Sequence, residues 1–386
     1  MAVRAHPSTN RLLLLVSAIV LVDTMFYAVV APLLPQLKDE LDLSKVSAGL
    51  LTAAYPAGTL FGSLPAGALA ARIGPKNTVV TGLSLLAIST LAFGLIHDIH
   101  ALDVARFVQG IGGACSWAGG LAWLVAVAPP ERRGEMIGTA LGAAIGGALL
   151  GPVVGGLAQA TSRALVFSSV VVFAGGLIVI VLRTPATHQR VAERVGDVLA
   201  ALRHRPIAVG MWLVALPSVA FGVLGVLGPL RLDVLGASGI AIGATYLVAA
   251  GVEATVSPVV GRVSDRRGRL APIRVGLTGA AAALLVVTIP TTPMLLGAVI
   301  VVLSTTLGMF WAPAMAMLSE SAETVGLSQG LAFALVNLAW AGGQVFGASS
   351  GGLLAKATTD AVPLAVAAGL CIATLIVVVV RPDQVR

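Results

Sequence analysis

The chain is dominated by long apolar runs that contain almost no charged residues. Twelve runs have about the 20 residues that an α-helix needs to cross the hydrocarbon core of a bilayer, and charged or turn-forming clusters separate them. The runs lie near residues 11–36, 46–70, 78–96, 102–128, 137–160, 165–182, 208–230, 239–261, 271–290, 293–318, 327–355 and 360–380. Their polarity does not alternate, which excludes the strands of a membrane β-barrel. The sequence therefore predicts an all-α membrane protein with twelve transmembrane helices.

Charged residues are too few to cover the surface of a soluble protein. Only 11% of the residues are charged and 57% are hydrophobic, whereas soluble domains have about 25% charged residues. If the N-terminus is cytoplasmic, eighteen of the 24 Lys and Arg residues lie on the cytoplasmic side, five lie opposite, and Arg106 lies within a span. This bias is typical of multi-pass membrane proteins. It predicts a protein of the bacterial inner (plasma) membrane with both termini in the cytoplasm, and it explains the basic charge without a nucleic-acid partner.

The longest hydrophilic segment, 183–207, divides the chain into halves of similar size. We expect an N-terminal six-helix bundle over 1–182, a cytoplasmic linker over 183–207 and a C-terminal six-helix bundle over 208–386. Within the linker, apolar residues recur at helical spacing opposite charged ones: Val191, Val195, Val198, Leu199 and Leu202. The pattern favours an amphipathic helix on the membrane surface over a flexible basic linker.

Two motifs occur twice at nearly the same separation. The pattern GGxxxGxxxGGL begins at Gly146 and again 196 residues later at Gly342. A loop rich in glycine and basic residues begins at Gly67 and again 194 residues later at Gly261. A whole six-span unit is therefore repeated, which predicts two pseudo-symmetric six-helix bundles. Duplicated halves are typical of alternating-access transporters, although a channel could also be built in this way.

The repeated loop reads GALAARIGPK in its first copy and GRVSDRRGR in its second, and the chain also contains Arg106-x-x-Gln109 and the loop PERRG at 130–134. Together these motifs resemble those of the major facilitator superfamily, whose signature loop is Gly-x-x-x-Asp-Arg-x-Gly-x-Arg/Lys. The resemblance implies a twelve-helix major facilitator fold in which the loops take part in gating, through Gly67, Arg72, Gly74, Gly261, Asp265, Arg266, Gly268 and Arg269. Ala71 replaces the acid of the first copy. We therefore expect Asp265, in the second copy, to form the stronger conformational latch.

The glycine-rich run at 137–160 resembles the antiporter motif of the drug:proton exporters in that family. The motif residues are Gly138, Gly147, Gly151, Pro152, Gly155 and Gly156. The first span contains Asp23 followed by Pro32 and Pro35, and this pattern resembles the twelve-span drug-exporter branch of the family. Small residues let helix backbones approach closely, so the alternative is that the run serves helix packing alone. The resemblance implies exchange of a drug-like compound for protons.

Three charged residues fall well inside the predicted spans: Asp23, Arg106 and Glu253. A lone charge at the bilayer centre costs about 2.5–3.5 kcal/mol on insertion scales, so such residues normally face a cavity or a partner. Desolvation disfavours a charged carboxyl group, which can then take up and release protons. We expect Asp23 to be the main proton-coupling residue, Glu253 to couple protons or contact substrate, and Arg106 to serve the proton path or act as a counter-charge. The alternatives are a structural hydrogen bond for Asp23, a lipid-shielded helix seam for Glu253 and a structural ion pair for Arg106.

Aromatic and amide side chains in the spans are candidates for lining a substrate site. Aromatic rings bind flat apolar bodies and attract cations, and an amide gains nothing by facing lipid. The candidates are Tyr27, Tyr55, Trp117, Tyr246, Trp311, Asn337, Trp340 and Gln344. For each aromatic residue the alternative is helix packing or anchoring at the membrane interface. Two acids against one arginine leave the cavity net negative if all three are ionised, which favours cationic or basic compounds. Neutral lipophilic compounds are also expected.

These features predict proton-coupled efflux of small amphipathic compounds by a monomer that uses no cofactor and no metal ion. The sequence contains neither the GxxxxGK[ST] loop of ATP-binding proteins nor the GxSxG and HExxH motifs of hydrolytic enzymes. We therefore expect a transporter rather than an enzyme. One alternative is a transporter of the same fold that carries sugars or other metabolites. A less favoured alternative is a channel or a non-transporting membrane sensor.

Overall fold

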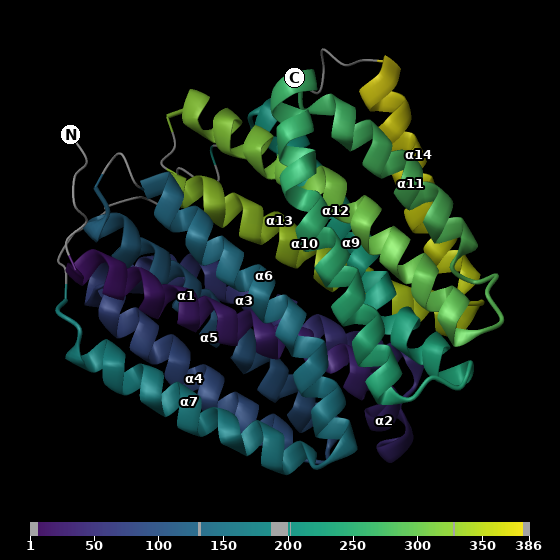
Figure 1. The fold of residues 1–386 in the computed structure, drawn as a ribbon, viewed down its shortest axis with the longest axis horizontal. Helices are drawn as coiled ribbons and strands as arrows, with labels where there is room; N and C mark the ends of the chain where they lie inside the picture. The colour runs from purple at the N-terminus through teal and green to yellow at the C-terminus, as the bar shows by residue number, and fades with distance from the viewer. Residues whose placement is uncertain (1–6, 130–132, 187–199, 201, 327–328, 381–386) are drawn as a thin grey trace. The chain divides into compact units, whose positions relative to one another are not determined.

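The computed structural model describes residues 7–129, 133–186, 200, 202–326 and 329–380. In these ranges the chain forms thirteen α-helices and no β-strand (Figure 1). Within the described residues, each predicted apolar run coincides over most of its length with a helix, or with two helices in the case of the first run. Helices are expected here because a backbone inside a bilayer must satisfy its own hydrogen bonds.

The helices form two compact units, and the first consists of Met1–Val30 and Ala57–Ala192. Its helices are α1 (Pro7–Ala28), the second part of α3 (Lys45–Ile73), α4 (Pro75–Leu95), α5 (Ile99–Val127), α6 (Arg133–Ala160) and α7 (Arg163–Arg183). Helix α1 packs on α5 and α6, while α4 packs on α5 and α7 (Figure 1). Apolar side chains such as Ile19, Leu83 and Trp123 join α1, α4 and α5 in one core.

The second unit consists of Ala31–Pro56 and Glu193–Arg386. Its helices are α2 (Val30–Glu40), the first part of α3, α9 (Arg205–Val234), α10 (Gly239–Arg267), α11 (Leu270–Val286), α12 (Pro293–Thr324), α13 (Gln329–Ala357) and α14 (Ala361–Val380). An ion pair between Lys45 and Asp360 ties the start of α3 to this unit. Residues 31–56 thus pack with the second unit, whereas the sequence places them in the N-terminal bundle. The predicted boundaries of the linker stay a prediction.

The two units pack their helices in the same order. Helix α1 lies on α6 in the first unit as α9 lies on α13 in the second, and α4 lies on α5 and α7 as α11 lies on α12 and α14. The repeated loop also has the same backbone conformation in both copies. Gly74 has φ 87° and ψ 156°, and Gly268 has φ 83° and ψ 154°. Glycine adopts such positive φ angles without steric cost, and their recurrence supports a duplicated six-helix unit.

The first predicted span, residues 11–36, is interrupted about two thirds of the way along. Helix α1 ends at Ala28 and α2 begins at Val30. Pro32 lacks the backbone N–H that would bond to the carbonyl of Ala28 in a continuous helix. The break therefore leaves carbonyl groups at the end of α1 in need of other donors.

In the part of the chain that the structure describes, eight helical segments are long and apolar enough to cross a membrane. Helices α3, α5 and α13 have 29 residues each, and α11 is a shorter apolar helix of 17. A total of twelve crossings stays a prediction. Most of the predicted amphipathic helix of the linker, residues 187–199 and 201, lies outside the described residues, while Leu202 lies in a turn. Residues 130–132 of the PERRG loop and the side chain of Asp265 are also outside the description.

Candidate functional site

Asp23 lies in the last two turns of α1 and is buried, with 2% of its surface exposed. Its carboxylate Oδ2 accepts a hydrogen bond of 2.9 Å from the indole Nε1 of Trp117 in α5. The predicted proton-coupling acid and one predicted substrate-binding ring are therefore in direct contact. This contact is also the structural hydrogen bond between helices that the sequence left as the alternative for Asp23.

Arg106 lies on the same face of α5 and is buried, with 1% exposed. Its Nη1 donates to the Phe26 carbonyl at 2.9 Å, and its Nη2 donates to the Tyr27 carbonyl at 3.2 Å. These are carbonyls in the last turn of α1, where the helix leaves acceptors unsatisfied and where a positive charge is favourable. Arg106 thus caps α1 at its break. This role was not predicted from the sequence, although Pro32 indicates that α1 ends nearby.

A buried hydrogen-bond chain continues from Arg106 to a third helix. Its Nη1 also donates to Gln109 Oε1 at 2.5 Å, and Gln109 Nε2 donates to the Thr90 hydroxyl of α4 at 2.7 Å. The guanidinium lies 5.8 Å from the centroid of the Phe93 ring. Sequence reasoning missed Gln109, Thr90 and Phe93 as site residues. Only Gln109 gave a signal, since it shares a helix face with Arg106.

Local sequence sets the register of this face of α5. Asp98 precedes the helix, and its side chain accepts a hydrogen bond from the backbone N–H of Ala101 at 2.9 Å. Such an N-cap satisfies one of the free donors of the first turn. Arg106, Gln109 and Trp117 then recur at intervals of three and eight residues, which places all three on one side of the helix.

Glu253, in α10 of the second unit, has a different environment. It lies against Gly308 of α12, where an added Cβ would come within 2.7 Å of the Glu253 Cγ and Oε1 atoms. Among the described residues, no hydrogen bond or ion pair involves Glu253. Because Gly308 has no side chain, the Glu253 carboxylate fits closely against α12. It makes this contact without a hydrogen bond or ion pair to any described residue.

The other predicted substrate residues of the second unit lie on four helices. The Tyr246 hydroxyl donates to the Leu224 carbonyl of α9 at 3.2 Å, so part of its role is to pack α10 on α9. Tyr55 is buried in α3, and Gln344 is buried in α13. Asn337, Trp340 and Trp311 are half-buried. The substrate-binding roles of these residues stay predictions.

The glycines of the antiporter motif divide into two groups. A Cβ at Gly147 would lie 2.2 Å from the Leu21 carbonyl oxygen, and one at Gly151 would lie 2.5 Å from the Ala28 Cβ, so both glycines let α6 approach α1 closely. Gly138 has nothing within 4 Å. Gly347 makes the equivalent approach to Val219 in the second unit. Helix packing therefore explains the middle of the motif but not its beginning.

The signature loops have structural roles at helix ends. Gly74 precedes α4 and Gly268 follows α10, while Arg269 forms an ion pair with Glu320 of α12. Arg72 and Arg266 are exposed. Gly67 and Gly261 have open space around them. An asymmetric latch through Asp265 stays a prediction.

Comparison with known proteins gives the family. A family model described as Major Facilitator Superfamily matches residues 16–332. The chain is 30% identical over 141 residues to the MFS-type transporter ppzB of Metarhizium rileyi, a match that covers 35% of this chain and 29% of that protein. It is 24% identical over 270 residues to the uncharacterized MFS-type transporter YcaD of Escherichia fergusonii, covering 69% and 70%. The chain thus spans less than a third of the length of the first of these relatives.

The fold agrees with a solved transporter over almost the whole chain. The similar structure is a partially occluded inward-open conformation of the xylose transporter XylE from Escherichia coli, with a TM-score of 0.77 and 14% identity, covering 97% of this chain and 98% of that one. The identity is too low to carry over more than the fold. The family match covers most of the sequence, and the fold is similar to that of XylE. The chain therefore belongs to the major facilitator superfamily and is an integral membrane protein with several spans.

Proposed function

We propose that this transporter exports small amphipathic compounds, cationic or neutral and lipophilic, in exchange for protons. The observation that carries the proposal is the buried carboxylate of Asp23 in α1, hydrogen-bonded to the indole of Trp117 in α5. An acid inside a membrane helix is costly and is commonly found on a proton or substrate path. The proposal includes twelve membrane crossings, cytoplasmic termini, a bacterial inner membrane and a monomer.

In this mechanism Asp23 exchanges a proton for the compound. The protonated carboxyl is neutral and is buried at little cost, whereas the ionised form needs a positive partner. A cation beside Trp117 supplies that charge, and the indole ring offers it an apolar, electron-rich face. When the compound leaves, a proton from the other side of the membrane replaces it. The membrane potential contributes about 2.3 kcal/mol per charge for each 100 mV.

Glu253 is proposed as a second coupling or cargo-binding acid. No described residue neutralises its carboxylate, which packs against Gly308 where a larger residue would not fit. Arg106, in contrast, is proposed to act by position, since its hydrogen bonds hold the end of α1 on which Asp23 lies. Its predicted place in the proton path remains part of the proposal.

A second candidate function is proton-coupled transport of a sugar or other polar metabolite. The polar face of α13 favours it, because Asn337, Trp340 and Gln344 follow one another at i, i+3 and i+7 and lie on one side of the helix. Amide groups and indole N–H groups suit sugar hydroxyls. The structural relative XylE is a xylose transporter. The direction of proton movement separates this function from export, because a symporter moves cargo with protons.

Purified protein in liposomes with an imposed pH gradient tests the proposal. With an acidic lumen, we expect uptake of tetraphenylphosphonium, because protons that leave the lumen drive an antiported cation inward. Xylose serves as the polar metabolite. Uptake of xylose driven by an acidic exterior, with no uptake of the cation in either direction, would replace export by symport.

The variant Asp23→Asn tests the residue assignment in the same assay. We expect it to lose pH-driven uptake while it elutes as a folded protein in size-exclusion chromatography. The matched control is Asp39→Asn, the same chemical change at an exposed residue of α2, which should transport like the wild type. Wild-type coupling in Asp23→Asn contradicts the assignment.

A further inference from the structure

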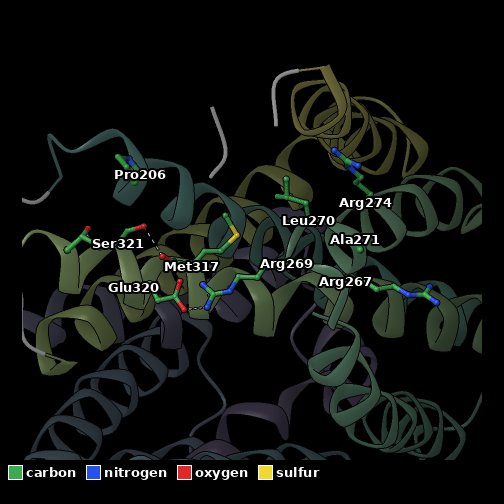
Figure 2. A pocket seen from close by; sticks show the side chains of 11 residues that line it. Pro206, Arg267, Arg269, Leu270, Ala271, Arg274, Met317, Glu320 and Ser321 are labelled. Atoms are coloured by element: carbon green, nitrogen blue, oxygen red, sulfur yellow. Dashed lines mark hydrogen bonds and ion pairs between the residues drawn. The ribbon is translucent and has the colours of Figure 1, made fainter. Parts of the chain in front are cut away.

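A cavity of about 540 Å³ lies at one end of the second unit (Figure 2). The first turn of α9, the end of α10, the start of α11 and the last turns of α12 form its wall. Three arginines and one glutamate line it: Arg267, Arg269, Arg274 and Glu320. The volume is in the range of small-molecule sites, and the charge of the described lining is positive.

The three arginines differ in the hydrogen bonds and ion pairs that they form. Arg269 is paired with Glu320, as the dashed line in Figure 2 shows. Arg274 donates its Nη2 to the Val378 carbonyl of α14 at 3.0 Å, but its buried Nε has no hydrogen-bond partner. Arg267 is exposed and has no hydrogen bond or ion pair within the described ranges. Two of the lining arginines therefore carry positive charges that no described carboxylate neutralises.

Two helix N-termini also open into this cavity. Pro206 lies in the first turn of α9, while Leu270 and Ala271 lie in the first turn of α11, and all three line the wall. Neither preceding residue, His204 or Arg269, caps its helix through the side chain. Pro206 has no backbone N–H, and the N–H of Ala271 donates to the Gly268 carbonyl at 3.3 Å. The C-terminal ends of α10 and α12 also line the wall, so the helix dipoles do not favour one sign of charge and the arginines alone favour an anion.

We propose that this cavity binds the phosphate of an anionic phospholipid headgroup. A phosphate group suits arginine donors because it accepts several charge-assisted hydrogen bonds. Lipid rather than free phosphate is favoured because apolar residues of α11 and α14 are exposed beside the arginines. Val275, next to Arg274, is 57% exposed, and Val379 and Val380, next to Val378, are exposed as well. These side chains offer a surface for the acyl chains, and basic pockets between membrane helices are known sites for anionic headgroups.

The test measures lipid binding by purified protein in a neutral detergent, from the concentration dependence of the melting temperature. The probes are dioctanoyl phosphatidylglycerol, dioctanoyl phosphatidylcholine and inorganic phosphate. We expect saturable stabilisation by phosphatidylglycerol and at least tenfold weaker effects of the other two. Arg274→Gln should weaken the phosphatidylglycerol affinity about fivefold, the factor that corresponds to one basic residue at a membrane surface. Arg183→Gln, at an exposed arginine at the end of α7, is the matched control and should bind like the wild type.

We expect Glu320→Gln to strengthen phosphatidylglycerol binding, which is the opposite of the effect of Arg274→Gln. It removes the carboxylate that competes for Arg269, so the phosphatidylglycerol affinity should rise by a similar factor. This variant keeps all three arginines, so it decides the matter if Arg274→Gln does not fold. Equal binding by inorganic phosphate would overturn the lipid assignment and leave a soluble phosphate site. Unchanged affinity in both Arg274→Gln and Glu320→Gln would overturn the cavity as the site.

Discussion

The two units hold their buried charges in different ways. In the first unit, Arg106 is engaged by two carbonyls of α1 and by Gln109, and Asp23 is engaged by Trp117. In the second unit, Glu253 packs closely against Gly308 and has no polar partner among the described residues. The arginine is hydrogen-bonded to the end of a helix, whereas the two carboxylates are the groups that we propose exchange protons or cations.

The largest expected effect comes from Arg106→Met. The substitution leaves the Phe26 and Tyr27 carbonyls and the Gln109 amide without their donor. Loss of a buried charged donor that serves several acceptors costs about 3 kcal/mol. We expect a marked fall in melting temperature in detergent and loss of transport. Arg183→Met, an exposed residue on α7, is the control. A melting temperature equal to that of the wild type would show that α1 does not depend on this cap.

The next effect in size is that of Gly308→Ala. The new Cβ would lie 2.7 Å from the Glu253 carboxylate, which must move. Overpacking of this kind costs about 2 kcal/mol, and transport should fall if Glu253 contributes to it. The control is Gly369→Ala in α14, where nothing lies within 4 Å, and thermal denaturation of both variants provides the comparison. Equal stability of the two variants would contradict the close contact between Gly308 and Glu253.

A smaller effect is expected for Trp117→Phe. The ring is kept and one hydrogen bond to Asp23 is lost, which costs about 1 kcal/mol. The dependence of tetraphenylphosphonium transport on the proton gradient should change more than the apparent affinity for tetraphenylphosphonium. The affinity should be largely kept because phenylalanine still offers an aromatic face. If transport kept its dependence on the proton gradient but lost its affinity for tetraphenylphosphonium, Trp117 would contact the transported compound without affecting proton exchange.

Glu253→Gln should have the smallest effect on stability. Since no described partner is lost, the free energy of unfolding should stay within about 0.5 kcal/mol of the wild type or rise. Transport of cations is expected to fall even so. This pairing of unchanged stability with reduced transport is the opposite of the result expected for a structural ion pair. A clear loss of stability would show that Glu253 holds the helices together.

The helices were predictable from the sequence, whereas most contacts of the site were not. Apolar runs mark membrane helices directly, and the repeated glycine motifs indicated the duplication that the helix packing supports. The partners of Arg106 are carbonyls 79 and 80 residues away in the sequence, and no local pattern encodes them. The contact of Glu253 with Gly308 likewise depends on the register between α10 and α12. Even the break in α1 was signalled only by a proline beyond it.

We propose that Asp23 gives up a proton when a cationic compound binds. Proton release from weakly buffered, purified protein on addition of tetraphenylphosphonium, followed with a pH-sensitive dye, measures this event without a membrane or a gradient. We expect proton release from the wild type and from Asp39→Asn, and none from Asp23→Asn. Undiminished release from Asp23→Asn would contradict this proposal and move the exchange to another acid.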